Sequence, residues 1–376
     1  MRLVLAALLV AGCGSSEHGS STSDGSSTRT SRTAIRDRFA PPPAGNVYAY
    51  DGAGNLSPAV RRDRALVYVP DSMSDSVTVI SQRTLKVVGQ FPTGALPQHV
   101  TPAYNLKTLY VDNDLGNSLT PINPRTGASG RPIPVEDPYN LYFTPDGRFA
   151  IVVAERLQRL DFREPATMRL VDSLSVPICR GVDHMDFSAD GRYAFVSCEF
   201  SGRMIKVDLE SRRVVGTLVI GNGLSSPQDV KLAPNGRVLY TADQQNGGLW
   251  EVDPFRFRVI GFVRTGAGAH GLYPSRDASV MYVSNRMAGT ISVISFSTRK
   301  VVATWQIPAP ASPDMGGVSA DGRTLWLSGR YNAEVYAIDT RAGGLRARIP
   351  VGSGPHGLCV WPQPGRYSLG HTGIMR

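Results

Sequence analysis

Histidines recur at one position of a repeated segment in this 376-residue chain. Four of the six histidines, with two aspartates, stand at the start of short apolar runs: His99, His184, Asp229, His270, Asp314 and His356. Neutral imidazole binds zinc, copper, nickel and iron, and imidazole and carboxylate groups also act as general acids and bases. These six residues are therefore candidate ligands for a substrate or a divalent metal. The alternative is a structural role for histidines that line a wet channel.

A segment of about 40 residues recurs along the chain between residues 66 and 361, and it must position these side chains. Its clearest part is an Asp-Gly or Asn-Gly turn followed by a short apolar run, as in 144–153, 188–197, 233–242 and 319–328. Short strands at this period are typical of a β-propeller with one four-stranded blade per repeat. The sequence therefore predicts an all-β, seven-bladed β-propeller of four-stranded antiparallel blades, whose inner strands bring the candidate residues to one channel.

The two ends of the repeated region predict how the ring closes. Residues 355–361 give an inner strand without its three partners, whereas 66–69, 77–80 and 87–91 give three strands without an inner one. Because an open ring would leave an unpaired sheet edge, we expect a closing blade shared between the N- and C-terminal segments. The segments left over are 46–51, 56–60 and 367–376, which leaves an eighth, partial blade as an alternative.

The N-terminus predicts export and a lipid anchor. Arg2 precedes an apolar run that ends in Val10-Ala11-Gly12-Cys13, which resembles a bacterial lipobox. We interpret residues 1–12 as a lipoprotein signal peptide, Cys13 as the lipidated residue and 13–43 as a disordered Ser/Thr-rich tether. Residues 44–376 then form the propeller domain. The predicted location is the cell envelope, on the outer side of the cytoplasmic membrane. An ordinary signal peptide, or a start further upstream, is the alternative.

Two of the other cysteines fall at neighbouring strand ends. Cys179 precedes a predicted inner strand and Cys198 ends the next strand, so antiparallel pairing brings them close enough for a disulfide in an oxidising compartment. Cys359 lies within an apolar strand and is expected to be a buried free thiol.

The formal charge of +9 does not by itself indicate nucleic-acid binding. Many of its arginines follow the Asp-Gly and Asn-Gly turns, where solvation is the simplest role: Arg148, Arg192, Arg237 and Arg323. We expect no nucleic-acid partner. The expected contacts are the membrane, through the lipid anchor, and a protein or cell-wall polymer, with the chain itself a monomer.

Two segments resemble the YVTN-type propeller repeat: VYVPDSMSDSVTVIS (67–81) and MYVSNRMAGTISVIS (281–295), together with Gly354-Pro355-His356-Gly357. The resemblance extends over essentially everything after the tether and implies the propeller fold. It implies no particular activity, because the family includes surface-layer and secreted propellers of differing roles.

Motifs of common enzyme classes are missing from the sequence. There is no P-loop, GxSxG, HExxH, CxxC or CxxCH, so the sequence shows no cofactor motif. A divalent metal is the one cofactor that remains a candidate. We interpret the chain as an extracytoplasmic, lipid-anchored binding or interaction scaffold. The alternative is a metal-dependent enzyme, similar to a lactonase or an oxidoreductase, that uses the His/Asp cluster at the channel mouth.

Overall fold

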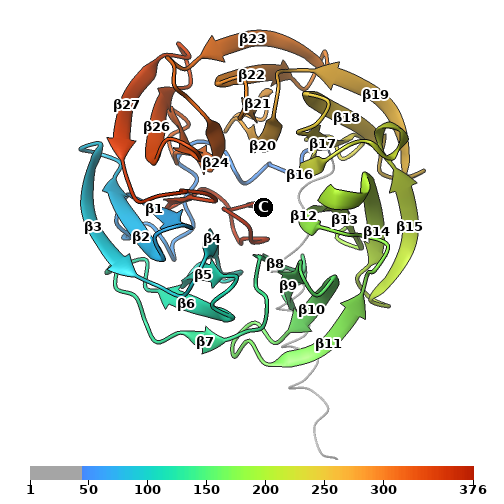
Figure 1. Ribbon diagram of the computed structural model, residues 1–376, viewed down its shortest axis with the longest axis horizontal. Helices are drawn as coiled ribbons and strands as arrows, with labels where there is room; N and C mark the ends of the chain where they lie inside the picture. The colour runs from blue at the N-terminus through green and yellow to red at the C-terminus, as the bar shows by residue number, and fades with distance from the viewer. Residues whose placement is uncertain (1–44) are drawn as a thin grey trace, which may run out of the picture. The chain divides into compact units, whose positions relative to one another are not determined.

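The computed structural model describes residues 45–376. Seven four-stranded antiparallel sheets surround a central channel like the blades of a wheel (Figure 1). The predicted seven-bladed, all-β propeller is therefore confirmed. The predicted signal peptide, Cys13 and the tether lie outside the described residues.

Six blades are continuous in sequence. The first contains β4 (Pro97–Pro102), β5 (Leu109–Asn113), β6 (Ser118–Ile122) and β7 (Ile133–Pro134). The second contains β8 (Asn140–Phe143), β9 (Ala150–Ala154), β10 (Arg159–Arg163) and β11 (Leu170–Ser175). The third contains β12 (Val182–Phe187), β13 (Tyr193–Cys198), the 3-10 helix η1 (Glu199–Ser201), β14 (Arg203–Asp208) and β15 (Arg213–Val219).

The 3-10 helix η2 (Gly221–Gly223) leads to the next three blades. The fourth contains β16 (Pro227–Leu232), β17 (Leu239–Asp243), β18 (Gly248–Asp253) and β19 (Arg258–Arg264). The fifth contains β20 (Ala269–Pro274), β21 (Val280–Asn285), β22 (Thr290–Ser295) and β23 (Lys300–Gln306). The sixth contains β24 (Pro313–Val318), β25 (Thr324–Gly329), β26 (Glu334–Asp339) and β27 (Leu345–Pro350).

The seventh blade joins the two ends of the repeated region, as the sequence predicts. Its inner strand β28 (Cys359–Trp361) pairs with β1 (Leu66–Asp71), which is followed by β2 (Ser76–Ser81) and β3 (Lys86–Pro92). Leu66 lies opposite Trp361 and Tyr68 opposite Cys359. The ring is thus closed without an exposed inner-strand edge.

A hydrogen-bond pattern recurs in several blades at the turn from the second to the third strand. At the end of β5, the amide of Asn113 donates to the hydroxyls of Ser118 and Thr120, at 3.1 and 2.9 Å. Asn285 bonds Thr290 and Ser292 with the same spacing in the fifth blade. In the closing blade Asp71 accepts from Ser76 and Thr78 instead. A short polar side chain at this position therefore pins the loop between the second and third strands.

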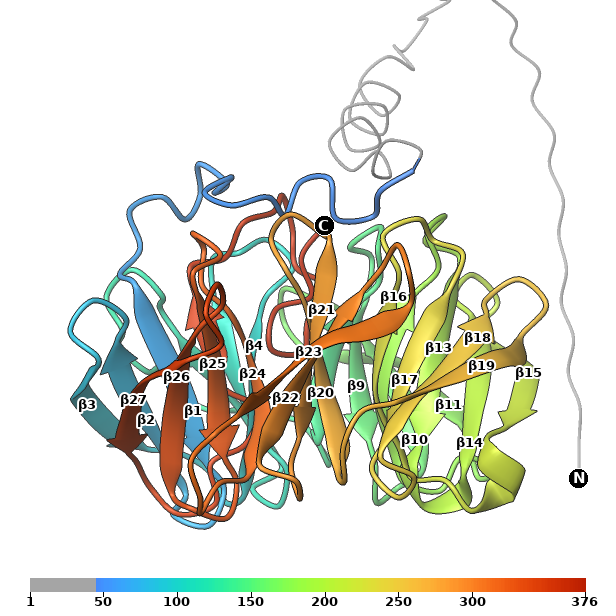
Figure 2. The same ribbon diagram turned by 90° about the horizontal axis from the view of Figure 1, so that it is seen from above.

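The wheel has two different faces. The turn face carries the loops between first and second strands, and residues 45–65 cross it, with Val47 N–H donating to Pro234 O and Gly54 N–H to Ala320 O. The loop face carries the loops between second and third strands. Figure 2 shows the blue N-terminal segment and the C-terminus along the upper edge of the wheel. The left-over segments thus cover the turn face and form no eighth blade within residues 45–376.

Cysteine placement and membrane topology complete the fold. Cys179 and Cys198 are joined in a disulfide with a Cα–Cα distance of 4.8 Å. Cys359 is buried and free. Within residues 45–376, no helix combines the length and apolarity needed to cross a bilayer.

Candidate functional site

The C-terminal segment 367–376 forms a tight hairpin inside the channel. Leu369 N–H donates to Ile374 O at 2.7 Å, and the hairpin is held to the second blade by bonds from Phe143 N–H to Leu369 O and from His371 N–H to Leu141 O. His371 stands at its tip. Sequence reasoning missed this residue because it belongs to no repeat, although the flanking Gly370 and Gly373, both at positive φ, mark a turn.

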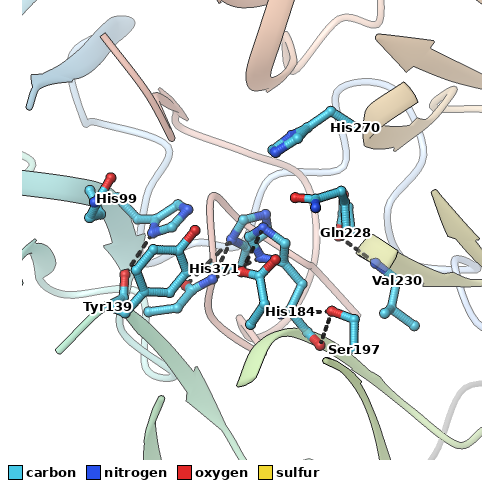
Figure 3. A network of polar contacts seen from close by, with 12 residues as sticks. His99, Tyr139, His184, Ser197, Gln228, Val230, His270 and His371 are labelled. Carbon is cyan, nitrogen blue, oxygen red and sulfur yellow. Dashed lines mark hydrogen bonds and ion pairs between the residues drawn. The ribbon is translucent and has the colours of Figure 1, made fainter. Parts of the chain in front are cut away.

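Five imidazoles lie close together at the centre of the propeller. We call this cluster the hub: His99, His184, His270, His356 and His371. His99 and His184 are the third residues of β4 and β12, and His270 is the second residue of β20. Ring centroids lie 4.9 Å apart for His99 and His356, 5.1 Å for His99 and His371, and 4.7 Å for His184 and His371. Figure 3 shows four of the five rings, those of His99, His184, His270 and His371, pointing into the same space. The structure therefore brings four predicted histidines together and adds a fifth.

The cluster divides into two groups of potential ligands, each with its donor atoms within 4.8 Å of one another. The first group is His99, His184 and His371, and the second is His270, Asp314 and His356. The division follows the strand register. Third-position histidines of the inner strands meet the hairpin tip, whereas His270 and Asp314, which both occupy the second position, meet His356.

Each imidazole of the first group has a buried Nε2 atom. The Nε2 atoms of His99, His184 and His371 are buried and form no hydrogen bond within the described residues, although Nε2 of His184 lies 3.2 Å from Asp183 Oδ1. Such atoms are rare in native structures, because an unsatisfied buried polar group costs roughly 1–3 kcal/mol. Clustered imidazoles with buried Nε2 atoms can bind a cation or water.

Neighbouring groups orient these rings from behind. His99 Nδ1 lies 2.8 Å from Tyr139 O and so donates to it, which leaves Nε2 with its lone pair. The side chain of Asn140 lies between the Nδ1 atoms of His184 and His371, with its nitrogen at 3.0 and 3.2 Å. The oxygen of the Asn140 side chain is 3.4 Å from Nδ1 of His371, so it can also accept a hydrogen bond from that ring. Contacts of this kind fix the tautomer of a histidine. A donor to Nδ1 places the proton on Nε2, so metal binding at Nε2 of His184 and His371 requires the Asn140 amide to present its oxygen to both rings.

Burial keeps all five imidazoles neutral near neutral pH. It lowers the pKa of His99 to about 3. Burial also holds the pKa values of the other four rings well below the ordinary value for histidine. Neutral imidazole is the form that binds metals.

The second group is already partly neutralised. Arg286 donates to Asp314 Oδ1 from Nη2 at 2.6 Å and from Nε at 2.9 Å. His270 Nδ1 lies 3.2 Å from the same oxygen. His356 donates from Nδ1 to Gln98 Oε1 at 2.9 Å, and its Nε2 is 3.6 Å from Asp314 Oδ2. With its carboxylate held by an arginine, this group offers less to a cation than the three imidazoles do.

Asp229 belongs to neither group, although its position in the repeat matches that of His99 and His184. Its carboxylate accepts the backbone N–H of Val230 at 2.8 Å and that of Leu272 at 2.9 Å, and Lys231 Nζ lies 3.6 Å away. The side chain thus links the inner strands of two neighbouring blades. Its role in the described residues is structural.

Two half-buried glutamates lie in the loops of the loop face. Glu155 follows β9 and Glu199 begins η1. Burial, with the charge of Glu199 next, raises the pKa of Glu155 to about 7. Burial also raises the pKa of Glu199, although Gln228 and Ser226 hydrogen-bond its carboxylate. The mouth of the channel therefore carries one carboxyl group, that of Glu155, able to exchange protons near neutral pH.

Known proteins resemble the chain in fold and, more distantly, in sequence. A family model described as YNCE-like beta-propeller matches residues 59–166 and 246–364. A 6-phosphogluconolactonase of Serratia proteamaculans is 25% identical over 336 residues, which cover 81% of this chain and 88% of that protein. Among solved structures, a functionally unknown protein from Desulfotomaculum acetoxidans has a TM-score of 0.67 at 14% identity, covering 78% of this chain and 98% of that one. A putative 6-phosphogluconolactonase from Bacteroides uniformis has a TM-score of 0.61 at 16% identity, covering 79% and 99%.

Proposed function

We propose that this chain, which belongs to the YNCE-like beta-propeller family, is a binding scaffold that holds a transition-metal ion in its hub. The ligands are His99, His184 and His371. The observation that supports this is the buried cluster of three imidazoles, in which Nε2 of His99 and of His371 forms no hydrogen bond among the described residues and Nε2 of His184 has only Asp183 Oδ1 nearby, at 3.2 Å. Three neutral imidazoles favour zinc, copper, nickel or iron over the oxygen-seeking magnesium and calcium.

The geometry needs only a small adjustment. A tetrahedral zinc ion with bonds of about 2.0–2.1 Å separates its ligand atoms by roughly 3.4 Å. The donor atoms of the first group lie within 4.8 Å of one another, so the rings have to move inward slightly. The remaining coordination position is left for water or a bound molecule.

Elemental analysis of the purified full-length chain tests this proposal. We expect about one equivalent of metal per chain after loading with zinc or copper and removal of excess, and loss of most of it in His99→Ala and His184→Ala. His18→Ala is the control, because His18 lies outside the described residues and outside both groups. A chain that folds normally and takes up no metal would refute the proposal.

We also propose that the protein works at the cell envelope as a lipoprotein of the YVTN-repeat type. The lipobox-like sequence before Cys13 supports this location, and so does the Cys179–Cys198 disulfide, since disulfides persist mainly in oxidising compartments. Metabolic labelling with an alkyne fatty acid tests it. The label should reach the wild-type chain and be lost in Cys13→Ser, and labelling of neither protein would contradict the anchor.

A lactonase-like hydrolase is the second candidate function. Support for this candidate comes from the relatives that are named 6-phosphogluconolactonase. In this chain, Glu155 is half-buried and has a pKa of about 7, which suits a general base that activates water. Hydrolysis of 6-phosphogluconolactone above the spontaneous rate, lost in Glu155→Gln, would support an enzyme. Equal rates with and without the protein would exclude this activity.

A further inference from the structure

Large apolar side chains are exposed on the loop face in a repeating pattern. Six of the seven blades place one at or next to the second residue after the second strand, and we call this set the apolar ring: Met73, Leu115, Leu157, Phe200, Met287 and Tyr331. Exposed fractions reach 72% for Met73 and 67% for Met287. Ile178 and Leu224, in loops that enter inner strands on the same face, are exposed as well.

The opposite face lacks such a ring. Of the seventeen exposed large apolar side chains among the described residues, eight lie in loops of the loop face. On the turn face there is one, Phe255, in the turn between β18 and β19, and the rest lie on outer strands. Residues 45–65 cross the turn face, and the C-terminal hairpin enters the channel from that side (Figure 2). The chain's own segments thus cover the turn face, which has few exposed apolar side chains. Exposed apolar groups concentrated around a polar centre are typical of interaction sites.

Two carboxyl groups near the centre of the ring have no cationic partner in contact with them in the described part of the chain. Glu155 and Glu199 form no ion pair within the described residues, and each charge raises the energy of the other. The nearby Arg286 is occupied by Asp314 and by Gln244. A cation placed at the mouth would therefore gain two carboxylates without displacing an existing arginine.

We propose that the loop face docks a protein partner that presents apolar side chains around a lysine or arginine, with that cation entering the mouth beside Glu155 and Glu199. The apolar ring supplies the buried contact area, and the carboxylates set the orientation. Aromatic residues, methionine and arginine are enriched at the centre of protein interfaces. This inference does not depend on metal in the hub.

Selection from a random peptide library displayed on phage, against the immobilised full-length chain, tests the proposal. We expect enriched peptides to carry aromatic or leucine residues around a lysine or arginine. Synthetic copies should bind the double variant Phe200→Ser with Met287→Ser at least about tenfold more weakly. Peptides with glutamate in place of the central lysine or arginine should bind the wild-type chain more weakly by a similar factor. The original peptides should likewise bind the double variant Glu155→Gln with Glu199→Gln more weakly by a similar factor.

Phe255→Ser is the matched control, because Phe255 is equally exposed but lies on the turn face. It should bind the peptides like the wild type, and all variants should keep the wild-type metal content and melting temperature. Absence of enrichment, or enrichment without a central cation, would overturn the proposal. So would flotation with phosphatidylglycerol vesicles, or self-association in sedimentation, that is lost in the same ring variants, since these would assign the face to a lipid surface or to a second copy.

Discussion

The rings of His371 and His184 lie 4.7 Å apart, although one belongs to the C-terminal hairpin and the other to the inner strand of the third blade. The hairpin therefore completes the group of three imidazoles that no blade forms alone. Metal binding is thus expected to depend on how firmly the hairpin sits in the channel.

Substitution of Gly370 should weaken metal binding without removing a ligand. Gly370 has φ of +99°, and a Cβ there would come within 2.5 Å of the Cα of Tyr142, so alanine must push the hairpin tip away. We expect the zinc Kd of Gly370→Ala to rise at least about tenfold. Gly344→Ala is the control because a Cβ at that position meets open space. Isothermal titration of both variants checks this, and equal affinities would show that the hairpin does not control the site.

Asn140 should act as a positioning residue. It contacts the Nδ1 atoms of His184 and His371, so leucine at this position leaves both rings without their hydrogen-bonding neighbour. Loss of a hydrogen-bond partner behind a metal-binding histidine typically costs 10–100-fold in metal affinity. With cobalt as a probe, we expect Asn140→Leu to weaken binding and to change the visible spectrum, whereas Asn140→Gln should recover part of both. A variant with an unchanged spectrum would contradict this role.

The sequence predicts the propeller fold better than the central histidine cluster, for a physical reason. Turn residues such as Asp190-Gly191 act within one blade, so the repeats show them independently. The closing blade follows from counting strands. His371, in contrast, reaches the hub through a hairpin with no repeat, and the different roles of Asp229 and Asp314 depend on neighbours from other blades. Exposure of the apolar ring becomes apparent only once the loops of all blades are placed on one face.

Asp71 should make stability depend on pH. Burial raises its pKa from 3.8 to about 6 in the folded chain, although Thr78 and Ser76 donate to it. The fold therefore favours the protonated form. This contribution is fully present below about pH 4 and is lost as pH rises through about 6, which amounts to roughly 2–3 kcal/mol.

Asp71→Asn should remove that pH dependence and retain the fold. Asn113 and Asn285 already form the same loop contacts in other blades, so asparagine fits the position. Urea unfolding between pH 4 and 8 should show a difference between variant and wild type that grows in favour of the variant from pH 4 to about 6 and then stays constant. A constant difference over this range would show that Asp71 does not titrate in it.

Loss of the Cys179–Cys198 disulfide should destabilise the third blade. The bond joins residues 19 positions apart, and closing a loop of this size in the unfolded chain stabilises a protein by about 3 kcal/mol in the chain-entropy account. We expect the double variant Cys179→Ser with Cys198→Ser to unfold at lower urea concentration by about that free energy. Dithiothreitol should shift the urea midpoint of the wild type toward that of the variant and leave the variant unchanged.

Because the loop between these cysteines includes His184, loss of the disulfide should also weaken metal binding. A variant with reduced stability but wild-type affinity for zinc would show that the hub is held by the other blades.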